Sequence, residues 1–388
     1  MSLATANDRL LAERTRANAA FFAAEADRIA RLCHAMAERF ARGGRLLALG
    51  GSPAARSDAH HVAVEFVHPV IVGKRALPAL ALTAVGGDPA AQLALLAERD
   101  DIVVAFDGEA ALAGAARRGC LTIAFAEGAP AAWTLVPRSD DPFVRQELAE
   151  TLYHVLWELV HVFFEHRGLL EGRSERREHD AGGSSFLYPF LAEREDDLAA
   201  VLDDVRRSVL MKADEVAALR AQTLAEPGLG EAAAALRACF DAGGRVLVLG
   251  NGGSATDAMD LVADLRAPPR PWPARPALDL TEDAAILTAL ANDIGVENVF
   301  ARQVIAHGRA GDALVAISTS GGSANVLAAL AEARRRGLRT VALVGYDGGR
   351  VAAEGLADHV VVTRSQHIPR IQEAQASAYH VLRELLER

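Results

Sequence analysis

The fold of this chain is decided by a short apolar run and the glycine turn after it, which read GGRVLVLGNGGS over residues 243–254. A run such as Val246–Leu249, ended by glycine, is typical of a strand buried in a parallel sheet. A related stretch stands 200 residues earlier, where residues 43–54 read GGRLLALGGSPA. Later the offset is 226 residues, since Tyr153–Leu156 and Tyr379–Leu382 both read YHVL. These repeats predict a tandem duplication of one domain, with length changes between the copies.

Further apolar runs predict the strands of each copy. The first copy has candidates at Arg45–Leu49, Ala79–Leu82, Ile102–Phe106 and Leu121–Phe125. The second has candidates at Arg245–Leu249, Ala277–Leu280, Ala313–Ile317, Thr340–Val344 and Val360–Val362. Helical patterns separate these runs, and strands that alternate with helices form a parallel sheet covered on both faces. We therefore predict the α/β class, with two tandem domains that each form a flavodoxin-like three-layer sandwich.

The length of 388 residues fits two domains, each large enough for its own core. We place the first domain at residues 1–166 and the second at residues 188–388. Residues 167–187 are charged and rich in glycine, which is the composition of a linker.

Long helical patterns open and close each domain. The opening patterns are Leu10–Phe40 and Phe190–Phe240, and the second is interrupted near Pro227, because proline does not continue a helix. The closing helices are predicted at Val144–Phe164 and Ile371–Leu386.

The composition restricts the partners and the compartment. A formal net charge of −10 argues against nucleic acid, because a phosphate backbone requires a positive surface. The three cysteines lack metal-ligand spacing and indicate buried thiols in a reducing compartment. The first residues do not resemble a signal peptide, and no apolar run reaches the roughly 20 residues of a membrane span. We expect a cytoplasmic protein without a membrane partner.

Two loops of the second copy suit a phosphate group. The turn Gly250–Ser254 leads from a strand into a helix, and such glycine-rich turns point backbone N–H groups at an anion. The loop Ser318–Ser323 reads STSGGS, also leads into a helix, and offers four hydroxyl groups. The alternative is that these hydroxyls only cap the helix, although one cap needs only one hydroxyl.

Together with Ala291–Asp293 and Arg370–Glu373, these two loops resemble the sugar isomerase (SIS) domain, and within it the phosphoheptose isomerases. The resemblance covers nearly all of residues 240–388. It implies that the serine loop grips the phosphate of a sugar phosphate, while the glycine turn and the Asn-Asp pair contact the sugar. The substrate-binding candidates implied in this way are Asn251, Gly252, Gly253, Ser254, Asn292, Asp293, Ser318, Thr319, Ser320, Ser323 and Gln372.

The same resemblance implies a divalent metal, usually zinc, bound by a His and a Glu four residues apart and by a Gln and a His eight apart. In the first copy these positions are His61, Glu65, Gln146 and His154. Residues i and i+4 share a helix face, so His61 and Glu65 can converge on one ion. A single histidine is more often a buried or capping residue than a ligand. His60 is the alternative candidate ligand to His61, but only His61 stands four residues before Glu65.

Each copy lacks a part that the other has. In the second copy Asp260 and Asp264 replace the His-Glu pair, so that these two residues with Gln372 and His380 form a weaker metal set. In the first copy Asp107–Glu109 align with the start of the serine loop, and carboxylates there repel a phosphate dianion. Pro53 also removes an N–H donor from the glycine turn of the first copy.

The resemblance implies an aldose–ketose isomerase that acts on a sugar phosphate, with sedoheptulose 7-phosphate and a heptose 7-phosphate as the favoured pair. Glu65 is the candidate base and His154 the candidate acid of an enediol mechanism, and the metal stabilises the developing oxyanion. If the second copy works alone, Asp264 and His380 take these roles. Active sites of this family tend to lie at subunit interfaces. The metal set of one copy and the serine loop of the other are therefore expected to form a composite site, either within one chain or between two chains. We also expect a homodimer of tandem chains.

Two other functions remain open at this point. A regulatory or scaffold protein that binds a sugar phosphate without catalysis is favoured by Asp260, Asp264 and the acidic loop Asp107–Glu109, while the complete set in the first copy argues against it. A nucleotide-binding module ranks last, because the glycine turns lack both the GxGxxG pattern and the lysine of a Walker loop.

Overall fold

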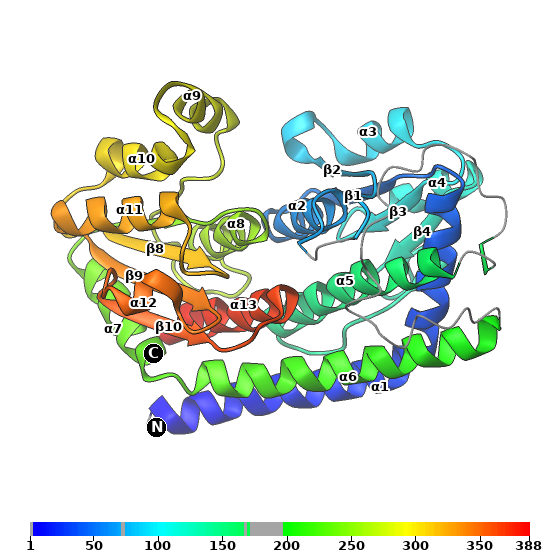
Figure 1. Ribbon diagram of the computed structural model, residues 1–388, viewed down its shortest axis with the longest axis horizontal. Helices are drawn as coiled ribbons and strands as arrows, with labels where there is room; N and C mark the ends of the chain where they lie inside the picture. Colours follow the sequence, from blue (N-terminus) through cyan, green and yellow to red (C-terminus); the bar gives the residue numbers. More distant parts are fainter. Residues whose placement is uncertain (1–2, 71–73, 167–168, 171–196) are drawn as a thin grey trace. The chain divides into compact units, whose positions relative to one another are not determined.

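The computed structural model describes residues 3–70, 74–166, 169–170 and 197–388. Contacts within the chain group it into two units, whose elements are labelled in Figure 1. The C-unit comprises Met1–Thr15, Pro142–Glu147 and Glu215–Arg388, and the N-unit comprises Arg16–Asp141 and Leu148–Asp214. Of the predicted linker, only residues 169–170 are described, and the start of the second helical pattern, residues 190–196, also lies outside the described residues. The domain bounds given above stay a prediction.

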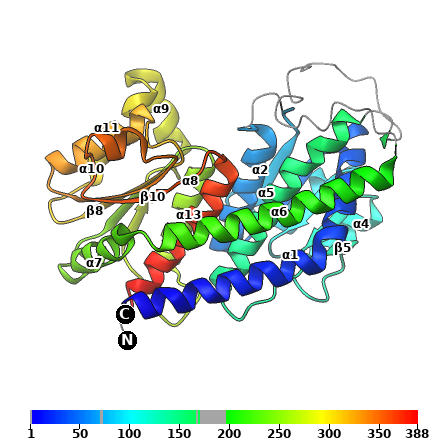
Figure 2. The same ribbon diagram turned by 60° about the horizontal axis from the view of Figure 1, so that its bottom comes forward.

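The N-unit is built on a parallel sheet with the strand order β2-β1-β3-β4-β5. Its strands are β1 (Leu46–Gly50), β2 (Ala79–Thr83), β3 (Ile102–Ala105), β4 (Leu121–Ala124) and β5 (Trp133–Thr134). The helices that lie in it wholly or in part are α1 (Leu3–Ala41), α2 (Pro53–Val67), α3 (Pro89–Leu96), α4 (Leu112–Arg117), α5 (Pro142–Glu165) and α6 (Leu198–Leu224), with short 3₁₀ turns η1 (Ala84–Gly86) and η2 (Glu109–Ala111). Within this unit α1 and α6 run side by side in both views (Figures 1 and 2), and the Asn18 side chain donates to the Ala213 carbonyl at 2.9 Å.

The C-unit repeats the same plan with the strand order β10-β9-β8-β6-β7. Its strands are β6 (Val246–Leu249), β7 (Ala277–Asp279), β8 (Ala313–Ser318), β9 (Arg339–Gly345) and β10 (His359–Thr363). Its further helices are α7 (Pro227–Asp241), α8 (Gly253–Arg266), α9 (Ala284–Ile294), η6 (Val296–Asn298), α10 (Val299–His307), α11 (Ala324–Arg335), α12 (Gly349–Ala353) and α13 (Ile368–Leu385). One apolar core joins the sheet to α7, α8 and α13, and a second joins its other face to α10 and α11 (Figure 1).

The strand registers show that the two units share one topology. In the N-unit the central strand pairs Leu46 with Ile102 and, on its other side, with Ala79. In the C-unit Val246 pairs with Ala313 and with Ala277 in the same way. The predicted fold, two parallel sheets flanked by helices, is therefore confirmed. The short strand β5 was not predicted, because its two residues are only half-buried and show no apolar run.

Local sequence signals explain where the helices begin. Pro227 is in the first turn of α7, and it separates this helix from α6 where the predicted interruption falls. The helix α2 also begins at a proline, Pro53, and the hydroxyl of Ser52 accepts a hydrogen bond from the Ala55 N–H at 3.4 Å. In the described part of the chain, no helix is both long enough and apolar enough to cross a membrane.

Candidate active site

The glycine turn of the C-unit connects β6 to α8. Position 250 requires glycine, because an added Cβ would lie 2.0 Å from the Ser254 carbonyl oxygen. Gly252 has a φ of +56°, a left-handed value that favours glycine. Within the described part of the chain, the N–H groups of the exposed residues Asn251 and Gly252 have no hydrogen-bond acceptor. The turn therefore presents N–H donors to solvent at the start of a helix.

The serine loop, residues 318–323, follows β8, which is the strand beside β6. Gly321 has a φ of +57°, and an added Cβ there would lie 2.3 Å from the Gly348 carbonyl oxygen. The buried Ser318 hydroxyl accepts a hydrogen bond from the Gly321 N–H at 3.2 Å. These contacts hold the loop in a tight turn that only glycine can make at position 321.

The remaining hydroxyls of this loop are not used as a helix cap. Ser323 is the N-cap residue of α11, but its side chain makes no capping hydrogen bond. Its Oγ lies 3.5 Å from the Oγ of the exposed Ser320, which also accepts from the Gly322 N–H at 3.2 Å. Because two adjacent hydroxyls stand at a helix N-terminus without capping it, the loop is suited to bind an anion.

A pair of amides ties the glycine turn to the serine loop. Asn325, on α11 and 9% exposed, exchanges two hydrogen bonds of 2.9 Å with the side chain of Asn251. Sequence reasoning missed Asn325. Its position two residues after the last serine was a signal that it lies beside the loop, in the first turn of α11.

The other predicted sugar contacts lie on two different helices. Asn292 and Asp293 are exposed on α9, where Asn292 donates to the Asp293 carboxylate at 2.8 Å. No described hydrogen bond joins this pair to the two loops among the residues that the structure covers. Gln372 is buried near the start of α13, where Arg370 and Glu373 form a buried ion pair of 2.7 Å.

Three of the four predicted metal ligands of the first copy come together in the N-unit. His61 and Glu65 lie one turn apart on α2, His154 lies on α5, and all three are at most 3% exposed. The Nε2 atoms of the two histidines are 3.3 Å apart, and one ligand atom from each of the three residues lies within 4.8 Å of the others. In tetrahedral zinc sites with Zn–N bonds of about 2.05 Å, two ligand nitrogens are about 3.3 Å apart. Donor type and spacing therefore fit a zinc ion.

Two other candidates, His60 and Gln146, are not part of this three-residue group. His60 is half-buried on α2 and is not part of the group, and burial, followed by the charge of Arg56, lowers its pKa. The ring of Tyr153 lies 5.3 Å from the ring of His61. Gln146, the fourth predicted ligand, belongs to the C-unit, where its side chain donates to the Asp260 carboxylate at 2.9 Å.

The weaker metal set is arranged as an ion-pair network. Asp260, Asp264 and His380 lie within 4.8 Å of one another in the C-unit. His380 faces carboxylates with both ring nitrogens, with Nδ1 3.0 Å from Glu147 and Nε2 3.2 Å from Asp260. Gln372, the remaining member of this set, is buried on α13 as well.

The charges in this network are set by burial and by mutual pairing. Burial alone would lower the pKa of His380, but its hydrogen bonds to Asp260 and Glu147 outweigh burial and raise it to about 10. Burial, followed by the charge of Asp260, raises the pKa of Asp264 well above its ordinary value. Burial opposes ionisation of Glu147 too, but the charge of Arg14 and the bond to His380 hold its pKa well below the ordinary value. Without an ion, these charges pair with one another, and the metal role of this weaker set stays a prediction.

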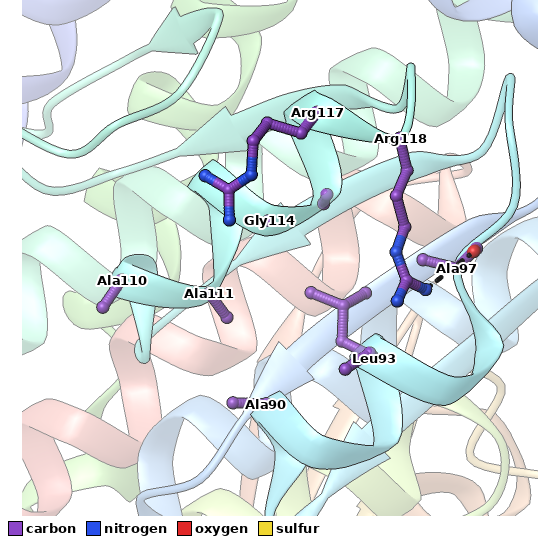
Figure 3. Close-up of a pocket in the computed structure, with 10 residues that line it drawn as sticks. Ala90, Leu93, Ala97, Ala110, Ala111, Gly114, Arg117 and Arg118 are labelled. Atoms are coloured by element: carbon purple, nitrogen blue, oxygen red, sulfur yellow. Dashed lines mark hydrogen bonds between the residues drawn. The ribbon is translucent and has the colours of Figure 1, made fainter.

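A separate pocket of about 440 Å³ lies between α3 and α4 of the N-unit (Figure 3). Alanines, one glycine and Leu93 line it together with Arg117 and Arg118, and Arg118 donates to the Ala97 carbonyl at 3.3 Å. None of the predicted site residues lines it, and its lining contains neither a carboxylate nor a histidine. We therefore place the candidate chemistry at the two loops and the three-residue group instead.

Comparisons with known proteins found a matching family model, similar sequences and similar solved structures. Residues 213–345 match the model of the SIS domain. The phosphoheptose isomerase of Geobacter sp. (strain M21) is 39% identical over 192 residues, which cover 48% of this chain and 96% of that protein. Tagatose-6-phosphate ketose/aldose isomerase from Escherichia coli has a similar fold, with a TM-score of 0.54 at 14% identity over 100% of this chain and 95% of that one. The C-terminal domain of glucosamine-fructose-6-phosphate aminotransferase from Francisella tularensis gives 0.60 at 10% identity, over 97% and 93%.

Proposed function

Because this chain belongs to the family of SIS-domain phosphoheptose isomerases and is a sugar-phosphate isomerase, we propose that it interconverts sedoheptulose 7-phosphate and an aldose heptose 7-phosphate. The observation that carries the proposal is the group of His61, Glu65 and His154, which combines a base, an acid and a set of metal ligands. A protein that only binds sugar phosphates has no evident use for this group.

The serine loop of the C-unit is the proposed phosphate grip. Its hydroxyls and the N–H groups at the start of α11 offer neutral donors to a phosphate dianion, so no cationic side chain is needed. The exposed N–H groups of Asn251 and Gly252 are proposed to donate to oxygen atoms of the same substrate. Gly253, Ser254, Asn292, Asp293 and Gln372 remain proposed sugar contacts.

The proposed reaction moves one proton between two neighbouring carbons. Glu65 removes a proton from the carbon beside the ketone, which gives an enediol, and returns it to the former carbonyl carbon, which gives the aldehyde. His154 moves a proton between the two oxygens, so no atom is gained or lost. A bound zinc ion would polarise the carbonyl and stabilise the negative charge on oxygen. His61, His154 and Glu65 would hold this ion.

Isotope exchange and product analysis test this proposal directly. The zinc-loaded protein is incubated with sedoheptulose 7-phosphate in D₂O, and NMR is used to detect the aldose and deuterium on the carbon beside the carbonyl. Pentose and hexose phosphates are run in parallel, to establish which sugar is preferred. The proposed function is rejected if no sugar phosphate exchanges deuterium while the protein is folded and carries zinc.

Three variants locate the chemistry. Glu65→Gln should abolish deuterium exchange and leave substrate binding nearly unchanged, because it removes the base and keeps the shape of the side chain. Ser320→Ala should instead weaken substrate binding, because it removes a hydroxyl from the phosphate grip. His60→Asn is the matched control, since His60 neighbours the group on α2 without belonging to it, and should keep normal turnover.

A further inference from the structure

The glycine turn of the N-unit is filled by a side chain of the same unit. The Asp107 carboxylate accepts hydrogen bonds from the N–H groups of Gly51 and Ser52, each at 2.7 Å. An added Cβ at Gly51 would lie 3.4 Å from the nearer Asp107 oxygen, so this carboxylate closes directly over the turn. A pair of adjacent backbone N–H groups is the usual cradle for an anion. In this unit the anion is already supplied by the protein.

The matching position in the C-unit is open. Since Leu46 pairs with Ile102 and Val246 pairs with Ala313, counting along each strand puts Asp107 at the position of Ser318. The N–H groups of Asn251 and Gly252, which match those of Gly51 and Ser52, have no acceptor within the described residues. The same turn is therefore occupied in one copy and available in the other.

We propose that the N-unit has replaced an external anionic ligand by a charged side chain of its own: the Asp107 carboxylate fills the anion position that the C-unit leaves open. One chain then binds one sugar phosphate, in the C-unit. This inference rests on the proposed function for the identity of that ligand, but not on turnover.

Counting the bound anion tests this inference. Titration calorimetry with inorganic phosphate should give one site per wild-type chain, and Ser320→Ala should weaken that site at least tenfold. Adding Asp107→Ser to Ser320→Ala should restore one phosphate site per chain, because it removes the internal carboxylate. Two sites in the wild type, or no gain from Asp107→Ser, would refute the role of Asp107.

If Asp107→Ser does not fold, the same phosphate titration is made with Asp107→Asn added to Ser320→Ala. Asparagine keeps one acceptor oxygen over the turn without the negative charge, and it should give a weaker gain in the same direction. No gain with a folded Asp107→Asn protein contradicts the inference. None of these phosphate counts depends on activity, so an inactive protein with one phosphate site would reject the isomerase and keep the inference.

Discussion

The buried charge network of the C-unit should be the most sensitive stability element of that unit. The Glu147 carboxylate accepts two hydrogen bonds of 3.0 Å from the Arg14 guanidinium, and both side chains are 1% exposed. Removing one partner of a buried ion pair leaves an unpaired charge and typically costs about 3–5 kcal/mol. In Glu147→Gln, Arg14 would keep Glu384 at 3.5 Å and His380 would keep Asp260, so part of the loss is offset. We therefore expect the lower end, about 3 kcal/mol of unfolding free energy.

The measurement is urea unfolding of the full chain, with a fluorescence signal that comes from the C-unit alone. Trp272 lies in this unit, so a Trp133→Phe/Trp157→Phe background makes tryptophan fluorescence report on the C-unit. Glu282→Gln is the matched control, because its partner Arg266 lies 3.7 Å away and both side chains are more than 40% exposed, and it should lose less than about 1 kcal/mol. A loss for Glu147→Gln as small as that of the control would show that the network does not stabilise the unit.

Three further results are expected from single changes in the C-unit. Gly321→Ala should weaken phosphate binding at least tenfold by calorimetry, because its left-handed conformation costs about 1 kcal/mol or more for alanine and the new Cβ would meet a carbonyl oxygen; unchanged affinity would contradict the tight turn. Asn325→Ala removes two hydrogen bonds to Asn251, each contributing about 1 kcal/mol, and should raise KM in steady-state assays by roughly tenfold with a smaller effect on kcat; an unchanged KM would exclude this role. The pKa of His380 is raised to about 10 from 6.5, so its contribution to stability is complete below pH 6.5 and is lost as the pH rises through about 10. Urea unfolding at pH 7 and pH 10 should thus show a larger loss for the wild type than for His380→Gln, and equal losses would contradict the raised pKa.

The repeated fold could be predicted because its signals are local. Apolar runs such as Val246–Leu249 and Ile102–Phe106 correspond to buried strands, and the glycine turns mark where strands end. The break at Pro227 follows from the chemistry of one residue. The strand Trp133–Thr134 could not be predicted, because it is held by pairing with β4 rather than by its own sequence pattern.

The site was predicted where residue type carries the chemistry, and not where partners are distant in sequence. The spacing of His61 and Glu65 predicts a shared helix face, and the structure places them together with His154. Nothing in the sequence near His380 indicates that Glu147 will pair with it, because the two residues are 233 positions apart. The acidic loop at Asp107 was expected to repel phosphate, but its bonds to backbone N–H groups follow only from the positions of β1 and β3.

The C-unit draws on three separate stretches of chain, and this limits how the two halves can be handled apart. A fragment cloned from residue 188 onward would contain the whole serine loop and His380, yet it would lack Arg14 and Glu147. The amino-terminal half thus donates structural parts to its sister as well as carrying its own sheet. The two halves of the sequence therefore depend on each other, because each contributes residues to the unit that the other half mainly builds. Shortening or exchanging one half alone would remove part of the other unit.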